Sequence, residues 1–175
     1  MIFKGDNLFM EYITDHYNMN IETLLVDRLK KMNLVLSLCE SCTGGRISAK
    51  ITSVPGASRV FDRGIITYSN KSKIDELGVK AETLNKFGAV SEETALEMAK
   101  GLIKKTNSNI VLSITGIAGP DGGTDEKPVG LVYICVMSKD KQKIIKNIFV
   151  GNRANIQERA TVIALLEINK FLNQE

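Results

Sequence analysis

The chain has 175 residues, of which 43% are hydrophobic and 25% charged, a composition typical of one ordinary globular domain. Its 23 basic and 20 acidic residues leave a net charge of +3 and are mixed along the sequence, so no basic stripe favours nucleic-acid binding. No apolar run approaches the roughly 20 residues of a membrane-spanning helix, and the N-terminus lacks a signal-type apolar stretch. The expectation is therefore a cytoplasmic protein with small-molecule partners and no membrane contact.

Periodicity divides the chain into an N-terminal arm, residues 1–20, and one domain, residues 21–175. Apolar or β-branched runs predict strands at 34–39, 61–70, 109–115, 131–138 and 143–150. Helical spacing and capping residues predict helices at 21–31, 46–54, 71–78, 81–87, 92–105 and 152–172. Because strands and helices alternate before a final hairpin, the expected fold is α/β, a three-layer α/β/α domain with a mixed sheet.

The segment Glu-Ser-Cys-Thr-Gly-Gly at 40–45 lies where a predicted strand ends and a helix begins. In open α/β sheets ligands bind at such places, because loops there meet free helix N–H groups. The two adjacent glycines would also let the backbone approach a ligand closely. Taken alone, however, the segment is better explained as a helix cap made by Ser41 or Thr43.

A second candidate is the segment Tyr68–Lys73 at another strand end. A lysine acts as a base only when neutral, and its usual pKa of about 10.4 must then be lowered by burial or a nearby cation. Lys71 and Lys73 lie two residues apart, so on a helix at most one would enter a site. Without further context, two solvated lysines at the start of a surface helix are the better interpretation.

The loop at 116–130 holds five of the 14 glycines and two of the three prolines. Loops of this length in a compact domain are usually functional or disordered, and here function is favoured. No Walker motif is present, so nothing supports nucleoside triphosphate hydrolysis. Arg153 is unfavourable at a helix N-terminus unless it binds a phosphate or carboxylate; a simply exposed arginine is an equally good explanation.

Cysteine and histidine content limits the possible chemistry. Cys39 and Cys42 form a C-x-x-C pair that could bond, bind metal or do redox chemistry. A structural zinc site needs about four ligands, and only Cys135 and His16 remain, both distant in sequence, so no metal is expected. His16 lies in a stretch without a motif, so a catalytic base is more readily a carboxylate, lysine or tyrosine.

Together these segments resemble the CinA C-terminal domain family, whose members include nicotinamide-nucleotide amidohydrolases. The resemblance covers about residues 21–172 and is carried by ESCTGG at 40–45, RGIITYSNKSK at 63–73, GAVSEETALEMA at 88–99, TGIAGPDGGTDEKPVG at 115–130 and GNR at 151–153. It implies hydrolysis of nicotinamide mononucleotide to nicotinate mononucleotide and ammonia, a step of pyridine nucleotide salvage and NAD metabolism, without a cofactor.

By this resemblance Ser41 matches the nucleophile, Lys73 the lysine that activates it, and Tyr68 a tyrosine close to that pair. A Ser-Lys arrangement is a known alternative where no suitable histidine exists. The N–H groups near Thr43, Gly44 and Gly45 are expected to stabilise the oxyanion. The full set of expected substrate-binding residues is Glu40, Thr43, Gly44, Gly45, Thr115, Gly116, Gly119 and Arg153, the last for the phosphate.

The sequence also departs from the family pattern. Cys39 replaces a small residue, commonly alanine, and Gln157 stands where arginine is frequent, which would change how an anionic substrate is held. The molybdopterin-binding-like domain of longer members is missing, so a stand-alone deamidase domain is expected.

Two other functions remain open. One is a non-catalytic nucleotide-binding or regulatory module related to competence and DNA damage, with which the family has a historical link. The other is a thiol redox protein that uses Cys39 and Cys42, although the Glu-Ser between them differs from the Gly-Pro of thioredoxins. Self-association into a homo-oligomer is expected, since the apolar run at 131–136 and the last helix would permit it.

Overall fold

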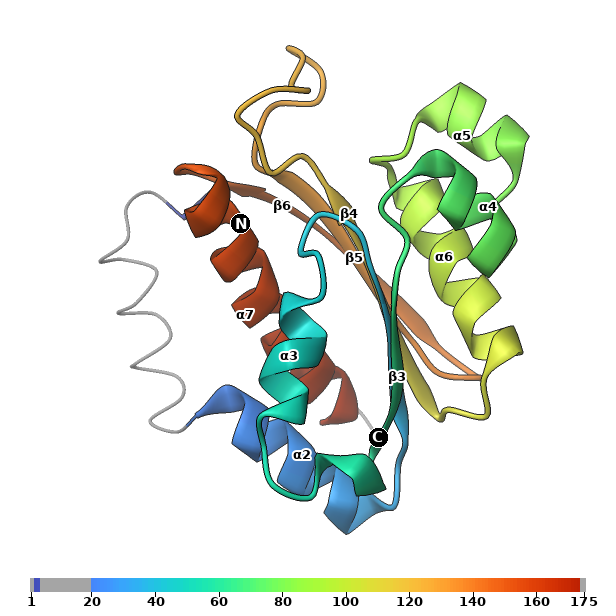
Figure 1. Ribbon diagram of the computed structural model, residues 1–175, viewed down its shortest axis with the longest axis vertical. Helices are drawn as coiled ribbons and strands as arrows, with labels where there is room; N and C mark the ends of the chain where they lie inside the picture. Colours follow the sequence, from blue (N-terminus) through green and yellow to red (C-terminus); the bar gives the residue numbers. More distant parts are fainter. Residues whose placement is uncertain (1, 4–19, 174–175) are drawn as a thin grey trace.

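The computed structural model describes residues 2–3 and 20–173, and within them a six-stranded sheet lies between two layers of helices (Figure 1). The strands are β1 (Ile2–Phe3), β2 (Leu36–Glu40), β3 (Phe61–Ile66), β4 (Ile110–Gly116), β5 (Leu131–Met137) and β6 (Gln142–Phe149). The helices are α2 (Ile21–Met32), α3 (Arg46–Thr52), α4 (Asn70–Leu77), α5 (Ala81–Phe87), α6 (Glu92–Lys105) and α7 (Arg153–Leu172), with a 3₁₀ turn at Ala57–Arg59. The predicted three-layer α/β/α fold is confirmed. Most of the predicted arm lies outside the described residues.

The sheet is mixed, with the strand order β1-β6-β5-β4-β2-β3. Strands β4, β2 and β3 run parallel, whereas β5 is antiparallel to both β4 and β6, which confirms the predicted hairpin. Parallel β2 and β4 end at the same edge of the sheet, where Glu40 is in register with Ile114. The segments that follow these strands are therefore neighbours in space.

Helices α2, α3 and α7 cover one face of the sheet, and α4, α5 and α6 cover the other (Figure 1). Successive side chains of a strand point to opposite faces, so Leu38 joins the core beneath α7 while Cys39 joins the core beneath α6. All five residues of β2 are buried. Burial on both faces explains why apolar residues point to both sides of this strand, while its two polar residues, Ser37 and Glu40, are buried as well.

Two predicted elements end two or more residues earlier in the structure. The strand predicted at 61–70 ends at Ile66, since Ser69 accepts a hydrogen bond from the Ser72 N–H and begins α4. The helix predicted at 46–54 ends at Thr52. Tyr68 therefore lies in the connection between β3 and α4 rather than within a strand.

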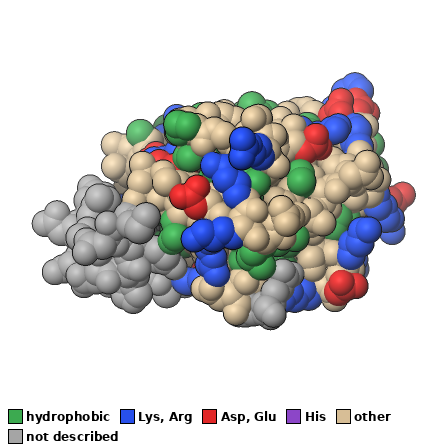
Figure 2. All heavy atoms as spheres, turned by 90° about the horizontal axis from the view of Figure 1, so that it is seen from below, with side chains coloured by type: hydrophobic (Ala, Val, Ile, Leu, Met, Phe, Trp, Pro, Cys, Tyr) green, Lys and Arg blue, Asp and Glu red, His purple; other side chains and the backbone are tan. Residues whose placement is uncertain are grey.

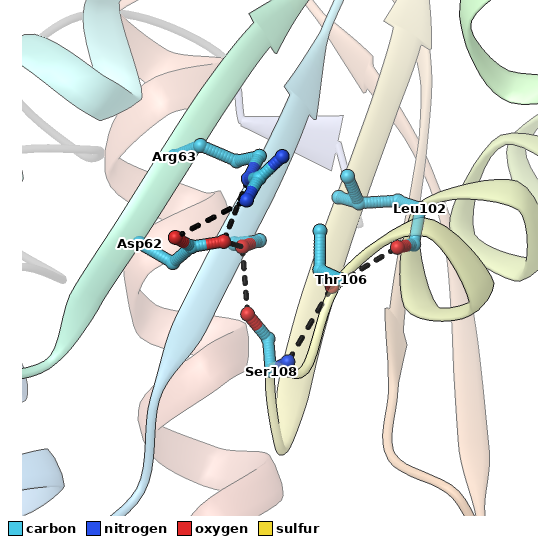
Figure 3. A network of polar contacts seen from close by, with 6 residues as sticks. Asp62, Arg63, Leu102, Thr106 and Ser108 are labelled. Carbon is cyan, nitrogen blue, oxygen red and sulfur yellow. Dashed lines mark hydrogen bonds and ion pairs between the residues drawn. The ribbon is translucent and has the colours of Figure 1, made fainter.

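Strand β3 forms one edge of the sheet and contains a bulge. Leu36 pairs with Phe61 but Ser37 pairs with Arg63, so Asp62 is the extra residue. The Asp62 carboxylate accepts hydrogen bonds from Ser37 Oγ at 3.4 Å and Arg63 Nε at 2.6 Å (Figure 3). A bulge and charged side chains hinder pairing with another strand, so β3 is a poor route to the expected homo-oligomer.

Charged side chains are dispersed over the face of the molecule that Figure 2 shows. On the face in Figure 2, basic side chains lie in several small groups with acidic and uncharged side chains between them. This agrees with the mixing of charges along the sequence. Among the described residues, no helix is both long and apolar enough to cross a membrane.

Candidate active site

Ser41 lies directly after the buried strand β2, on the turn that leads into α3. It is 8% exposed, and its N–H donates to the carbonyl of Ile114 on the neighbouring strand at 3.1 Å. Gly44 and Gly45 have φ angles of 60° and 93°, in the left-handed region where glycine is favoured. The turn thus fixes Ser41 at the carboxyl end of the parallel strands.

The carboxylate of Glu40 holds this turn to the start of α3. Glu40 is fully buried, and both of its oxygens are hydrogen-bonded. It accepts bonds from Thr43 Oγ1 (2.7 Å), the N–H groups of Gly45 (3.0 Å), Ile47 (3.2 Å) and Ser48 (2.9 Å), and Ser48 Oγ (2.7 Å). A carboxylate is favourable there because the first N–H groups of a helix have no partners within the helix.

These bonds give Glu40, Thr43, Gly44 and Gly45 a structural role in the turn. The Gly45 N–H is bonded to Glu40, and the Gly44 N–H donates to the carbonyl of Ser41 at 3.1 Å. Neither glycine N–H is therefore available as the expected oxyanion donor. Of these four residues, none lines the cavity in front of Ser41.

Lys73 lies in the first turn of α4 and points at Ser41. It is 1% exposed, and its Nζ lies 3.1 Å from Ser41 Oγ and donates to the Thr67 carbonyl at 2.7 Å. Lys71, by contrast, is exposed and pairs with Asp75 one turn along the helix. The prediction that at most one of the two lysines enters a site is confirmed.

The charge state of Lys73 depends on its burial. Burial lowers the pKa of its amine from the ordinary value, and the nearby Cys42 and Cys39 thiols partly oppose this change. Among the described residues, no carboxylate forms an ion pair with Lys73. Desolvation disfavours the ammonium form, so Lys73 is a better base than an exposed lysine.

A cavity of about 260 Å³ opens in front of Ser41 and Lys73. Its walls come from the Ser41 turn, the β3–α4 connection and the first turn of α4, the α5–α6 connection, the end of β4 with the loop after it, and the start of α7. Seven of the predicted site residues line it, namely Ser41, Lys73, Tyr68, Thr115, Gly116, Gly119 and Arg153. Ala89, Val90 and Asp121 also line it, and sequence reasoning missed them because none belongs to a strand end or a nucleophile motif.

The long loop at 116–130 is held in place on both sides of the cavity. At its base, the Gly130 N–H donates to the Ile117 carbonyl at 2.7 Å. Near its far end, Lys127 Nζ donates to the carbonyls of Val90, at 2.8 Å, and Phe87. Lys127 therefore joins the loop to the α5–α6 connection, which forms the facing wall.

Arg153 joins three segments at the cavity. It is the first residue of α7, whose start is fixed by reciprocal hydrogen bonds between Asn152 and Asn155. Its Nη1 donates to the Gly119 carbonyl at 2.8 Å and its Nη2 to the Tyr68 hydroxyl at 2.7 Å. Tyr68, which is 59% exposed, lines the same cavity as Ser41 and Lys73, but its hydroxyl bonds to Arg153.

Gln157 contacts the nucleophile turn from α7. It is 5% exposed, and its Nε2 donates to the Cys42 carbonyl at 2.7 Å. The sequence suggested an effect on anionic substrate, but the side chain bonds to backbone and does not line the cavity. No sequence signal could reveal this contact, because it joins residues 115 positions apart.

The two cysteines of the C-x-x-C segment are buried on opposite sides of the sheet. Cys39 belongs to the core beneath α6, and Cys42 to the core beneath α3 and α7; both are free thiols. Burial raises the pKa of Cys42 to about 12 and also raises that of Cys39. Since the thiolate is the reactive form, this geometry does not support a redox pair. His16 lies outside the described residues.

Comparison with known proteins identifies the family of the chain. The family model described as CinA C-terminal domain matches residues 18–172. A CinA-like protein of Kosmotoga olearia is 52% identical over 162 residues, a match that covers 93% of this chain and 39% of that protein. A CinA-like protein of Petrotoga mobilis is 48% identical over 149 residues, covering 85% of this chain and 37% of that protein. The chain thus spans under two fifths of the length of these relatives.

Solved structures agree with the sequence matches. A competence/damage inducible protein from Agrobacterium tumefaciens has a TM-score of 0.84 and 40% identity, with 89% of this chain and 96% of that chain covered. A CinA superfamily protein from Klebsiella pneumoniae has a TM-score of 0.86 and 29% identity, with 89% and 97% covered. With the family match over nearly all the described domain, these similarities show that the chain belongs to the CinA C-terminal domain family.

Proposed function

We propose that the chain is an amidohydrolase that converts nicotinamide mononucleotide to nicotinate mononucleotide and ammonia, with Ser41 as nucleophile and Lys73 as general base. The observation that carries the proposal is the buried Lys73 amine 3.1 Å from Ser41 Oγ. A serine hydroxyl is a weak nucleophile until an adjacent base accepts its proton. A desolvated lysine is suited to that task.

The reaction proceeds in two halves. Ser41 Oγ attacks the carboxamide carbon while neutral Lys73 accepts its proton, and the carbonyl electrons move to the oxygen. When the tetrahedral intermediate collapses, the C–N bond breaks, the Lys73 ammonium returns the proton to the leaving nitrogen, and ammonia departs from a Ser41 ester. Water then loses a proton to Lys73 and attacks the ester carbon, and Ser41 leaves with that proton. The carboxylic acid that forms releases water's other proton to solvent and becomes the carboxylate product.

The cavity walls supply the other roles in this proposal. Backbone N–H groups of the loop after β4 are further candidates for the oxyanion role beside that of Thr43, since those of Ala118 and Gly119 have no hydrogen-bond acceptor among the described residues and both residues line the cavity. Arg153 would bind the phosphate, since its guanidinium contacts only uncharged acceptors in the described chain.

The test is ammonia release from a panel of pyridine carboxamides that includes nicotinamide mononucleotide. Ser41→Ala and Lys73→Ala should each lower kcat by about 10³-fold or more, because neither half of the dyad works alone. Thermal unfolding serves as the control that both variants fold. A wild-type protein that releases no ammonia at high enzyme concentration would refute the proposal.

A second candidate is a nucleotide-binding or regulatory module without catalysis. It is favoured by the names of the solved neighbours, which refer to competence and damage. It predicts tight nucleotide binding without turnover. It also predicts that Ser41→Ala behaves like the wild type in every binding assay.

A further inference from the structure

Three of the residues that line the cavity have acidic or basic side chains: the buried Lys73 and the exposed Asp121 and Arg153. Arg153 is hydrogen-bonded to Gly119 and Tyr68. The Asp121 carboxylate, by contrast, has no hydrogen-bond donor and no cation as partner among the described residues. The Glu40 carboxylate is different, because both of its oxygens accept hydrogen bonds from the protein.

The segment that carries Asp121 is well anchored. Gly119 has a φ of 77°, and a Cβ there would lie 2.6 Å from Val129 Cγ1, so the two arms of the loop pack directly on each other. The Gly130–Ile117 bond closes the base of the loop, and Lys127 ties it to the α5–α6 connection. The loop therefore holds the carboxylate at the cavity without the carboxylate contributing to the loop's own bonding.

We infer that Asp121 is a specificity-determining residue that favours substrates with a positive charge on the ring that bears the carboxamide. The inference rests on the proposed function. A pyridinium nucleotide carries a positive ring and a negative phosphate, which match the negative Asp121 and the positive Arg153 of the wall. The dihydropyridine form of the same nucleotide has the same carboxamide, ribose and phosphate but an uncharged ring. Asp121 therefore selects the oxidised form over the reduced form.

The size of the effect follows from the exposure of Asp121. Two unit charges about 4 Å apart attract by about 1 kcal/mol in a water-like medium, which corresponds to about a fivefold preference. Because the pair is solvent-exposed, added salt should reduce this preference. A steric selection between the two rings would not respond to salt in this way.

The experiment compares dissociation constants of nicotinamide mononucleotide and its dihydropyridine form, measured by calorimetry in the Ser41→Ala background so that neither is consumed. Asp121→Asn keeps the size and turn-forming chemistry of the side chain and removes its charge. Asp125→Asn is the matched control, since Asp125 is an exposed acid of the same loop that does not line the cavity. Neither change should alter the melting temperature.

The preference for the oxidised form should fall about fivefold in Asp121→Asn, through weaker binding of the cation, and should persist in Asp125→Asn. An unchanged preference in Asp121→Asn, or an equal loss in Asp125→Asn, overturns the inference. Failure of both nucleotides to bind overturns the inference and the proposed function together. A preference that depends on Asp121, in a protein whose Ser41 form releases no ammonia, supports the inference and refutes only the amidohydrolase.

Discussion

Lys73 is the residue whose chemistry changes most on folding. In sequence it is one of two nearby lysines, whereas in the structure it is almost fully buried against Ser41 and the Thr67 carbonyl. Its burial is sustained by the cap at Ser69, which starts α4 so that Lys73, the fourth residue of the helix, points inward. The position of one capping serine thereby decides which lysine can serve as a base.

The lowered pKa of Lys73 predicts the pH dependence of turnover. The neutral amine is the active base, so kcat/KM should fall as pH drops through the folded-state pKa. Because burial lowers that pKa, the fall should lie at lower pH than the ordinary lysine pKa of about 10.4. A kcat/KM profile from about pH 5 to about pH 11 measures it, with Lys73→Arg as an inactive control that stays charged. A midpoint near 10.4 would contradict the assignment.

Gln157 is expected to position the nucleophile turn. Gln157→Glu keeps the shape but places a carboxylate oxygen against the Cys42 carbonyl oxygen, where Nε2 now donates. We expect kcat to fall about tenfold or more, because loss of a buried hydrogen bond costs about 1–3 kcal/mol and displaces the adjacent Ser41. Steady-state kinetics separates this loss of kcat from a binding defect, because KM should change little. The control is Thr161→Ser, on the next turn of α7. A rise in KM alone would indicate the substrate-anion role instead.

At the scale of elements, the site is the meeting point of four connections held by side chain to backbone bonds. Glu40 secures the β2–α3 turn, and Lys127 secures the loop after β4. The cavity is thus shaped by loops, but each loop is tied to a rigid element.

Removal of the Lys127 ammonium should loosen the wall of the cavity and leave the dyad intact. Lys127→Met keeps most of the side-chain length but leaves the Val90 and Phe87 carbonyls without this donor. We expect KM to rise about tenfold with a smaller change in kcat, since the wall and not the Ser41–Lys73 pair is disturbed. Initial-rate kinetics on nicotinamide mononucleotide tests this, and Lys86→Met, an exposed lysine of α5, is the control. A kcat loss equal to that of Lys73→Ala would place Lys127 in the chemistry.

At the scale of the whole molecule, the sheet separates two hydrophobic cores, and the C-x-x-C segment crosses from one to the other. Cys39→Ala should therefore leave turnover essentially unchanged while lowering the free energy of unfolding by about 1 kcal/mol, as expected for loss of one buried sulfur. Urea denaturation and ammonia release measure the two effects. The matched control is Cys135→Ala, which changes a cysteine of the same core. Complete loss of activity in a folded Cys39→Ala protein would support the thiol redox interpretation instead.

The sequence by itself determined the order and type of nearly all elements, because strand and helix periods are local properties that apolar spacing and caps encode directly. It also identified Ser41, Lys73 and the loop at 116–130 as candidates. Each of them belongs to a motif whose own residues are close together in the sequence. Only the tertiary structure decided that Glu40 and Gly45 bond to each other, that Gln157 donates to the Cys42 carbonyl, and that Asp121 lines the cavity without a partner among the described residues. The physical reason is that pKa, burial and hydrogen-bond partners depend on segments brought together by sheet order, such as β2 beside β4, and no local pattern in the sequence specifies that order.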